Sequence, residues 1–70
     1  MSQIRYFVLP VRERWTIRRS QRRIGAFAEP EQAIVTALEL AAIDRVRGHV
    51  VEVLKQDNDG RWGRCSLGPA

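Results

Sequence analysis

With 70 residues, of which 29% are charged, the chain holds one domain with a single small core, because chains this short bury only about 60% of the surface that they expose when unfolded. Its single cysteine excludes the internal disulfides that usually stabilise small secreted domains, and the sequence has neither a run of about 20 apolar residues to span a membrane nor a signal-peptide pattern. The net charge of +4, with arginine as almost the only basic residue, favours polyanions such as nucleic acid as partners, and we expect a cytoplasmic protein without membrane contact.

The N-terminal part of the chain predicts three strands. Residues 4–11 are rich in β-branched and aromatic side chains, which suit a pleated, half-buried surface better than a helix. Residues 15–18 alternate apolar and polar side chains, and residues 23–27 form the third strand. We expect a short turn over residues 12–14 and a looser loop over residues 19–22, because the Asn-Gly signature of a tight hairpin is missing there.

The hydrophobic period changes to that of a helix after residue 28. Pro30 fits the first helical position, and Glu29 takes the N-cap position, where Ser, Thr, Asp or Asn would cap better. Gly48 is the residue able to adopt the left-handed conformation past the last turn. Residues at spacings of three and four predict one broad face packed on the sheet, namely Ile34, Ala37, Leu38, Ala41 and Arg45, widened by Ala33, Leu40 and Ile43.

The C-terminal part predicts a fourth strand and a turn. Residues 49–56 contain β-branched residues with polar partners at alternate positions, and residues 57–60, Asp-Asn-Asp-Gly, are typical of a tight turn. Residues 61–67 have the composition to pair back as a fifth strand, and the pattern leaves open whether they do so.

In chain order these elements predict an α+β fold, β-β-β-α-β-(β), with one helix packed on an antiparallel sheet. We expect one domain over residues 1–70, with an ordered core over about residues 4–67 and a tail over residues 68–70. No repeat, low-complexity stretch or linker divides the chain.

Several short motifs follow one another along most of the chain. They are Trp15-Thr16-Ile17, Phe27, the helix entry Glu31-Gln32-Ala33-Ile34, Ala37 and Ala41, Val51-Glu52-Val53, and Asp59-Gly60-Arg61. In this order and spacing the chain resembles a family of short bacterial proteins catalogued only as a domain of unknown function. The resemblance implies the fold and a bacterial source but no activity, cofactor or site. The chain departs from the family in having Glu29 where Ser or Thr commonly caps the helix, and in its higher arginine content.

No catalytic or metal-binding set is present in the sequence. One histidine, His49, and one cysteine, Cys65, lack the paired spacing of a zinc site, and a nucleophile needs a base and an orienting group. Residues 57–60 resemble part of a calcium loop, but Lys55 and Ser66 stand where that loop needs acidic ligands. We therefore expect structural roles for His49 and Cys65. We also expect no cofactor, no metal and no enzymatic activity.

The arginines are the one set of residues with a binding chemistry behind it. Residues 1–23 hold seven of them against one acidic residue, Glu13. Guanidinium groups hold phosphates through two hydrogen bonds. Tyr6, Trp15 and Trp62 offer flat ring faces on which bases can stack, provided that these rings reach solvent. The alternation of apolar and polar residues around Trp15, however, favours a place in the core for this residue. The candidate nucleic-acid-binding residues, around the two predicted hairpins, are Arg12, Arg14, Arg18, Arg19, Arg22 and Arg23. A basic rim that only keeps the protein soluble is the alternative that charge alone leaves open.

A protein partner or a second copy of the chain is the competing interpretation. Residues 4–11 are apolar on both faces of the predicted strand, with Tyr6 and Val8 on one face and Phe7 and Leu9 on the other. One helix covers only one face, so another chain is the simplest cover for the second. We expect a binding protein whose leading partner is nucleic acid, with protein interaction or homodimerisation as the alternative. High salt weakens phosphate contacts but not an apolar interface, so the salt dependence of binding distinguishes a nucleic-acid partner from a protein partner.

Overall fold

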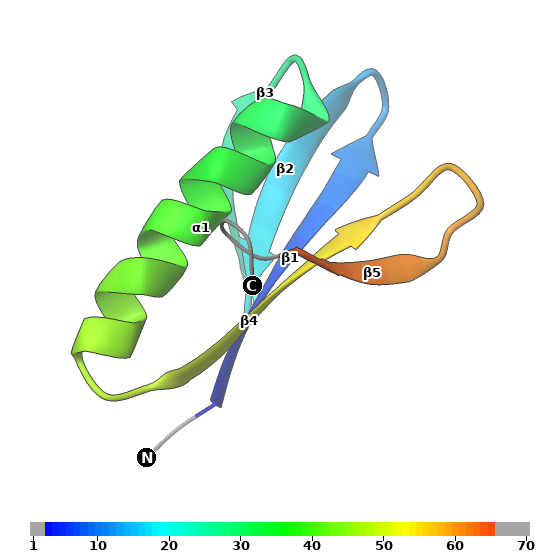
Figure 1. The fold of residues 1–70 in the computed structure, drawn as a ribbon. Coiled ribbons are helices and arrows are strands. Elements are labelled where there is room, and N and C mark those ends of the chain that lie inside the picture. Colours follow the sequence, from blue (N-terminus) through cyan, green and yellow to red (C-terminus); the bar gives the residue numbers. More distant parts are fainter. Residues whose placement is uncertain (1–2, 66–70) are drawn as a thin grey trace.

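One helix packs across one face of a five-stranded sheet in the computed structural model, which describes residues 3–65 (Figure 1). The elements are β1 (Gln3–Val11), β2 (Arg14–Arg19), β3 (Arg22–Phe27), α1 (Pro30–Val46), β4 (Val50–Gln56) and β5 (Trp62–Cys65). The predicted α+β class and the order β-β-β-α-β-β are confirmed, and the fifth strand that the sequence left open is present. The predicted end of that strand at residues 66–67 and the predicted tail lie outside the described residues.

The sheet is mixed, whereas the sequence predicted an antiparallel one. The strand order is β3-β2-β1-β4-β5, and β1 and β4 pair in parallel while the other three neighbouring pairs are antiparallel. Two hairpins leave β3 running parallel to β1, and α1 then carries the chain back across the sheet, so β4 starts at the same end as β1 (Figure 1). A helical crossover of this kind joins parallel strands, which explains the difference.

Both N-terminal hairpins close through two-residue turns, at residues 12–13 and 20–21. The looser loop predicted over residues 19–22 is therefore wrong. Arg12 and Ser20 take positive φ angles of 60° and 56° at the first position of their turns. A positive φ at that position alone is the pattern of a type II′ turn, whose twist matches that of the flanking strands. Such a short turn fixes which residues of neighbouring strands face each other.

A bulge in β3 brings two residues three positions apart onto the same face. Ile24 pairs with Ile17, and Phe27 pairs with Trp15, so β3 has one residue more than β2 over this stretch. Gly25 absorbs the extra residue at a φ of +71°, and a Cβ atom there would lie 2.9 Å from the Phe27 ring. The bulge lets both Ile24 and Phe27 pack against the core.

The helix ends as the sequence predicted at both termini. Glu29 is the N-cap residue, and its side chain makes no capping hydrogen bond. At the other end Gly48 has a φ of +92° and donates its N–H to the carbonyl of Arg45 at 2.9 Å, while the N–H of His49 donates to the carbonyl of Asp44 at 3.1 Å. These two bonds form a Schellman motif, which stops the helix and turns the chain into β4.

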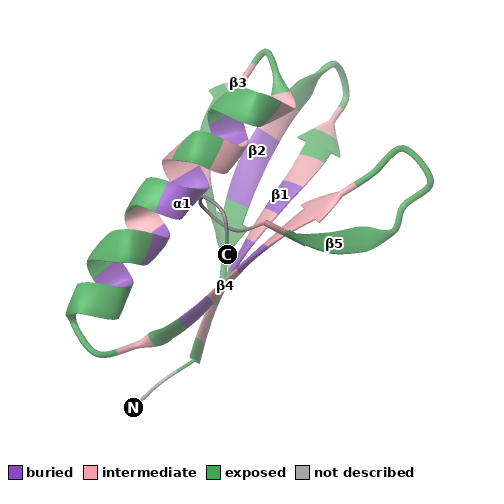
Figure 2. Ribbon diagram, in the orientation of Figure 1, coloured by how far each residue is buried: buried purple, intermediate pink, exposed green. Residues whose placement is uncertain are grey.

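The core lies between α1 and the strands that it crosses (Figure 2). Three of its residues are helix alanines, whose small side chains let the helix backbone lie close to the sheet. The buried apolar residues are Tyr6, Val8, Ile17, Ala33, Ala37, Leu38, Ala41, Val51 and Val53. Two residues predicted on the packed face of the helix lie outside it: Ile43 is 51% exposed, and Arg45 is exposed although its guanidinium donates a hydrogen bond to the carbonyl of Val51 at 3.1 Å. Asp44, between them, is buried instead.

Asp44 forms a buried polar contact with Tyr6. The Tyr6 hydroxyl donates a hydrogen bond to the Asp44 carboxylate, and both residues are buried. The Arg19 side chain completes the group, with its Nε atom 3.9 Å from Asp44 Oδ2 and its guanidinium carbon 5.9 Å from the centre of the Tyr6 ring. A carboxylate is tolerated at such a depth only when donors and a positive charge accompany it. Burial raises the pKa of Tyr6 to about 12, and the hydrogen bond to Asp44 acts in the same direction.

We expect alkaline pH to destabilise the fold through Tyr6, the single tyrosine of the chain. The unfolded chain releases the phenolic proton near pH 10 and the folded protein near pH 12, so the contribution of Tyr6 to stability is complete below pH 10 and is lost as the pH rises to 12. Titration of tyrosinate absorbance should give a midpoint near 12 in the folded protein and near 10 in urea.

The variant Tyr6→Phe is the control for this titration. It removes the absorbance change and should abolish the loss of stability over this alkaline range. At neutral pH it should lower the free energy of unfolding by about 1.5–3 kcal/mol, because the Asp44 carboxylate loses its donor. A tyrosinate midpoint near 10 while circular dichroism still reports the native fold would contradict the proposed burial of the hydroxyl.

Candidate functional site

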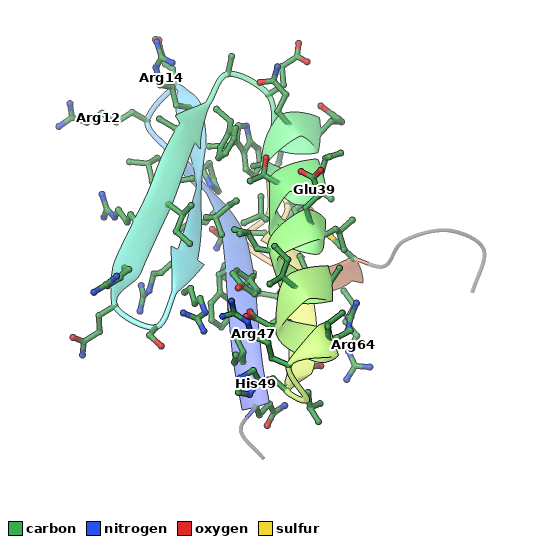
Figure 3. The ribbon with its side chains drawn as sticks, turned by 90° about the vertical axis from the view of Figure 1, so that its left-hand side faces the viewer. Arg12, Arg14, Glu39, Arg47, His49 and Arg64 are labelled. Carbon is green, nitrogen blue, oxygen red and sulfur yellow. The ribbon has the colours of Figure 1, made fainter. Side chains whose placement is uncertain are left out.

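No second layer covers the face of the sheet opposite α1 within residues 3–65. In Figure 3 the helix lies on one side of the sheet, and the side chains of Arg12 and Arg14 reach out on the other. We call the residues that alternate onto this uncovered side the open face. They are Gln3, Arg5, Phe7, Leu9 and Val11 of β1, Arg14, Thr16 and Arg18 of β2, Arg23 of β3, Val50, Glu52, Leu54 and Gln56 of β4, and Trp62 and Arg64 of β5.

Apolar side chains occupy the middle of the open face. Phe7 lies opposite Leu54 in the register of β1 and β4, and its ring centre is 5.3 Å from that of Trp62, with the ring planes at 74°. Edge-to-face aromatic pairs of this kind are favourable. Trp62 nevertheless remains 45% exposed, and Phe7 and Leu9 are only half-buried. The first strand therefore presents apolar side chains on both faces, as its sequence predicted.

A shallow depression lies beside the aromatic pair. It has a volume of about 160 Å³ and is lined by Phe7, Leu9, Arg18 and Trp62. Two aromatic rings and an aliphatic side chain offer contact to a flat apolar group, and the guanidinium offers hydrogen bonds to a negative one. The depression therefore suits a ligand that combines a planar ring with an anionic group.

The six arginines that the sequence singled out do not form one surface. Arg14, Arg18 and Arg23 lie on the open face, and Arg12 lies in the turn between β1 and β2. The other two, Arg19 and Arg22, alternate onto the side of α1, where Arg19 is engaged with Asp44 and Tyr6. The structure thus separates the predicted set into a group on the open face and a group on the helix side.

Several residues of the open face were not among the sequence candidates, and four of them bear on binding. Phe7 and Leu9 were identified only as apolar residues in need of cover, and Arg5 alternates with them along β1. That period of two was visible in the sequence. The position of Arg64 was not, because it follows from the pairing of β5 with β4.

Glu52 is the one acidic residue of the open face. Its carboxylate accepts a hydrogen bond from Arg5 Nε at 3.1 Å and lies 2.9 Å from Arg64 Nη2. The hydrogen bond from Arg5, together with the charges of Arg64 and Arg5, holds the pKa of Glu52 below its usual range. Arg5 and Arg64 are therefore already paired with an acid, while no ion pair forms at Arg14, Arg18 or Arg23 within the described chain.

Like charges face each other across the hairpin of β2 and β3. Arg18 lies directly opposite Arg23 on the open face, and Arg19 lies opposite Arg22 on the helix side. Like charges in facing positions destabilise a sheet. Asp44 partly compensates the Arg19 charge, but neither Arg18 nor Arg23 forms an ion pair with an acid among residues 3–65. An anion bound between these two guanidinium groups would relieve their repulsion.

The other residues that the sequence raised for binding or chemistry lie away from the open face. Tyr6 is buried under α1 and does not reach solvent. Trp15 packs against the core, as predicted, with the Lys55 ammonium 5.3 Å above its ring. Cys65 also packs there, and burial raises the pKa of its thiol. In the described part of the chain, no three His, Cys, Asp or Glu residues gather as metal ligands, and no helix is long and apolar enough to cross a membrane.

Comparison with protein-family models, with curated proteins and with solved structures finds no match to this chain. The resemblance to a domain of unknown function therefore stays a prediction from the sequence. The function has to be inferred from the chemistry of the open face.

We expect the substitution Arg23→Thr to stabilise the protein. It removes one of two like charges in facing positions and introduces a residue that favours strands, so the free energy of unfolding should rise by about 0.2–1 kcal/mol at low salt. Urea unfolding at low and high salt measures this change. The matched control Arg23→Lys keeps the charge and should give no gain. Equal or lower stability of Arg23→Thr at low salt would show that the two guanidinium groups do not repel each other.

Proposed function

We propose that this protein is a non-enzymatic nucleic-acid-binding protein that uses the open face of its sheet. In this proposal Arg14, Arg18 and Arg23 hold phosphate groups, beside the apolar centre around Phe7 and Trp62. The observation that carries it is the facing pair of Arg18 and Arg23, which has no acidic partner in the described chain and borders an exposed aromatic depression.

The chemistry of guanidinium groups supports phosphate as the ligand. Each group presents a planar fork of donors that matches two oxygens of one phosphate, and its charge does not titrate near neutral pH. Repeated phosphates along a backbone would neutralise several arginines in a row and release their counterions. A row of arginines on neighbouring strands matches such a repeated ligand better than a single anion.

The distribution of charge speaks against a role in solubility alone. Solubilising charge is usually a mixture of both signs spread over the surface. Here the open face holds five arginines and one glutamate, while the exposed surface of α1 and its C-cap carries both signs, with Glu31, Glu39, Arg45 and Arg47. The positive charge is therefore concentrated on the uncovered side of the sheet, where it can attract a polyanion.

The first test compares two neighbouring arginines on opposite faces of β3. Binding of labelled DNA and RNA oligonucleotides is followed by fluorescence anisotropy over a range of salt concentrations for Arg23→Ala and for its matched control Arg22→Ala. Each variant removes one positive charge that faces another arginine across the hairpin of β2 and β3. We expect Arg23→Ala to weaken binding and to reduce the slope of log K against log salt by about 0.7 on single strands or 0.9 on duplexes, while Arg22→Ala leaves the slope nearly unchanged.

Two outcomes would count against the proposal. If both variants weaken binding equally, the positive charge acts without regard to the face that carries it. If wild-type binding disappears at modest salt, the attraction is non-specific. Circular dichroism and urea unfolding of both variants confirm that each remains folded.

The second test changes the acidic residue of the open face. In Glu52→Gln the negative charge is lost and Arg5 and Arg64 are released from their ion pairs. We expect tighter binding, with a salt slope steeper by up to about 1.4 on single strands if both arginines then reach phosphates. Glu39→Gln, on the exposed side of α1 (Figure 3), makes the same change in net charge away from the open face and should have little effect. Equal gains in the two variants would contradict a localised site.

Homodimerisation through the open face is the second candidate function. The half-buried apolar residues Phe7, Leu9 and Leu54 favour it, because they lie uncovered beside the exposed Trp62. Two copies joined through this face would, however, bring together two surfaces that each carry five arginines and one glutamate. We therefore favour the polyanion. A dimer would be stable at high salt, in contrast to a complex held by phosphate contacts.

A further inference from the structure

We infer that the ligand of the open face is single-stranded nucleic acid, whose bases stack against Trp62 and Phe7 while its phosphates lie along Arg14, Arg18 and Arg23. This inference rests on the proposed function and names the class of nucleic acid. It follows from the position of exposed aromatic rings between charged residues on one uncovered surface.

An undistorted duplex offers no base face to exposed aromatic rings. Its bases are stacked within the helix and present only their edges in the grooves, and its outer surface consists of phosphates and sugars. Single strands expose the flat faces of their bases, which proteins bind through aromatic side chains and guanidinium planes. Trp62, on β5 and 45% exposed beside the depression that Arg18 also lines, is therefore a feature that a single strand can use and an undistorted duplex cannot.

The aromatic pair leaves ring surface for a base. The planes of Phe7 and Trp62 meet at 74°, so the contact between them joins the edge of one ring to the face of the other and does not occupy both faces of the indole. The depression beside the pair is open to solvent and is lined also by Arg18. A base stacked on Trp62 would thus have a guanidinium group within the same depression to meet its phosphate.

The register of the strands orders these groups across the sheet. At one level, pairing places Arg23, Arg18, Phe7 and Leu54 side by side on successive strands from β3 to β4. The row ends at Arg64 on β5, whose charge is paired with Glu52, so the positive charge without an acidic partner lies toward β3 and the apolar surface lies at Phe7 and Leu54. A single strand lying along this boundary can direct its phosphates to one side and its bases to the other, which a duplex of either form cannot do.

The decisive experiment varies the bases while keeping the phosphates. The probes are labelled oligothymidylate, oligouridylate, a strand of the same length made of abasic nucleotides, and a duplex of mixed sequence. Binding is measured at physiological salt for the wild type, for Trp62→Ala and for the control Val46→Ala, which changes a residue that is 88% exposed at the end of α1.

We expect the wild type to bind the thymidylate or uridylate strand about ten-fold more tightly than the abasic strand, since stacking on an aromatic side chain contributes on that order per base. Trp62→Ala should lose this advantage, with affinities for the abasic strand and the duplex unchanged, and Val46→Ala should behave as the wild type. Stacking should also quench the tryptophan fluorescence of the wild type. In Trp62→Phe, which keeps an aromatic ring next to Phe7, the base-containing strand should still bind but quenching should disappear, because the remaining Trp15 packs against the core.

Other results would overturn the inference in distinguishable ways. If the abasic strand and the duplex bind as tightly as the thymidylate strand and Trp62→Ala has no effect, single-strand recognition is wrong while phosphate binding remains. If no probe binds at physiological salt, both proposals fail. If sedimentation shows a dimer that Trp62→Ala dissociates in the absence of nucleic acid, a second copy of the chain occupies the open face.

Discussion

The hydrogen bond that Tyr6 donates to Asp44 ties the last turn of α1 to the central strand of the sheet. Arg19 adds a contact from the neighbouring strand β2, so three elements meet at one buried carboxylate. Since side chains alternate along a strand, holding Tyr6 under the helix also determines that Phe7 points to the opposite side. A shift of one residue would bury the arginines and expose the core, and it would separate Tyr6 from Asp44. The buried pair thus specifies which face of the sheet stays open.

Much of the fold could be predicted from local patterns, because the strands, the helix and its two ends depend on residues close in sequence. The proline at the helix start and the glycine behind its last turn act within a few residues, and both predictions are confirmed. Asp44 could not be predicted as buried, because hydrophobic periodicity assigns an acid to the surface and its partner, Tyr6, is 38 positions away in the chain. The same hydrophobic periodicity assigned Ile43 to the core, but Ile43 is 51% exposed and its neighbour Asp44 is buried in the packed face instead.

The candidate site was predicted in part, since the arginines were identified but their division between two faces was not. That division depends on the length of the turn between β2 and β3. A two-residue turn makes Arg19 face Arg22 and Arg18 face Arg23, and alternation then sends these two pairs to opposite sides. A looser loop would have left the register undetermined. The aromatic half of the site was harder to foresee, because the contact of Phe7 with Trp62 requires β4 to lie beside β1 and β5 beside β4.

The open face is complete only when β4 has paired in parallel with β1, because β5 joins the sheet through β4. The hairpins of β1, β2 and β3 join segments that are close in the chain, so this meander needs only short loops to close, whereas β4 must reach β1 across the whole length of α1. Arg14, Arg18 and Arg23 belong to this local part of the chain together with Phe7, whereas Trp62 belongs to the last strand. A chain in which β5 is missing or unpaired therefore presents the arginines and Phe7 without Trp62, and only the finished topology completes the aromatic pair.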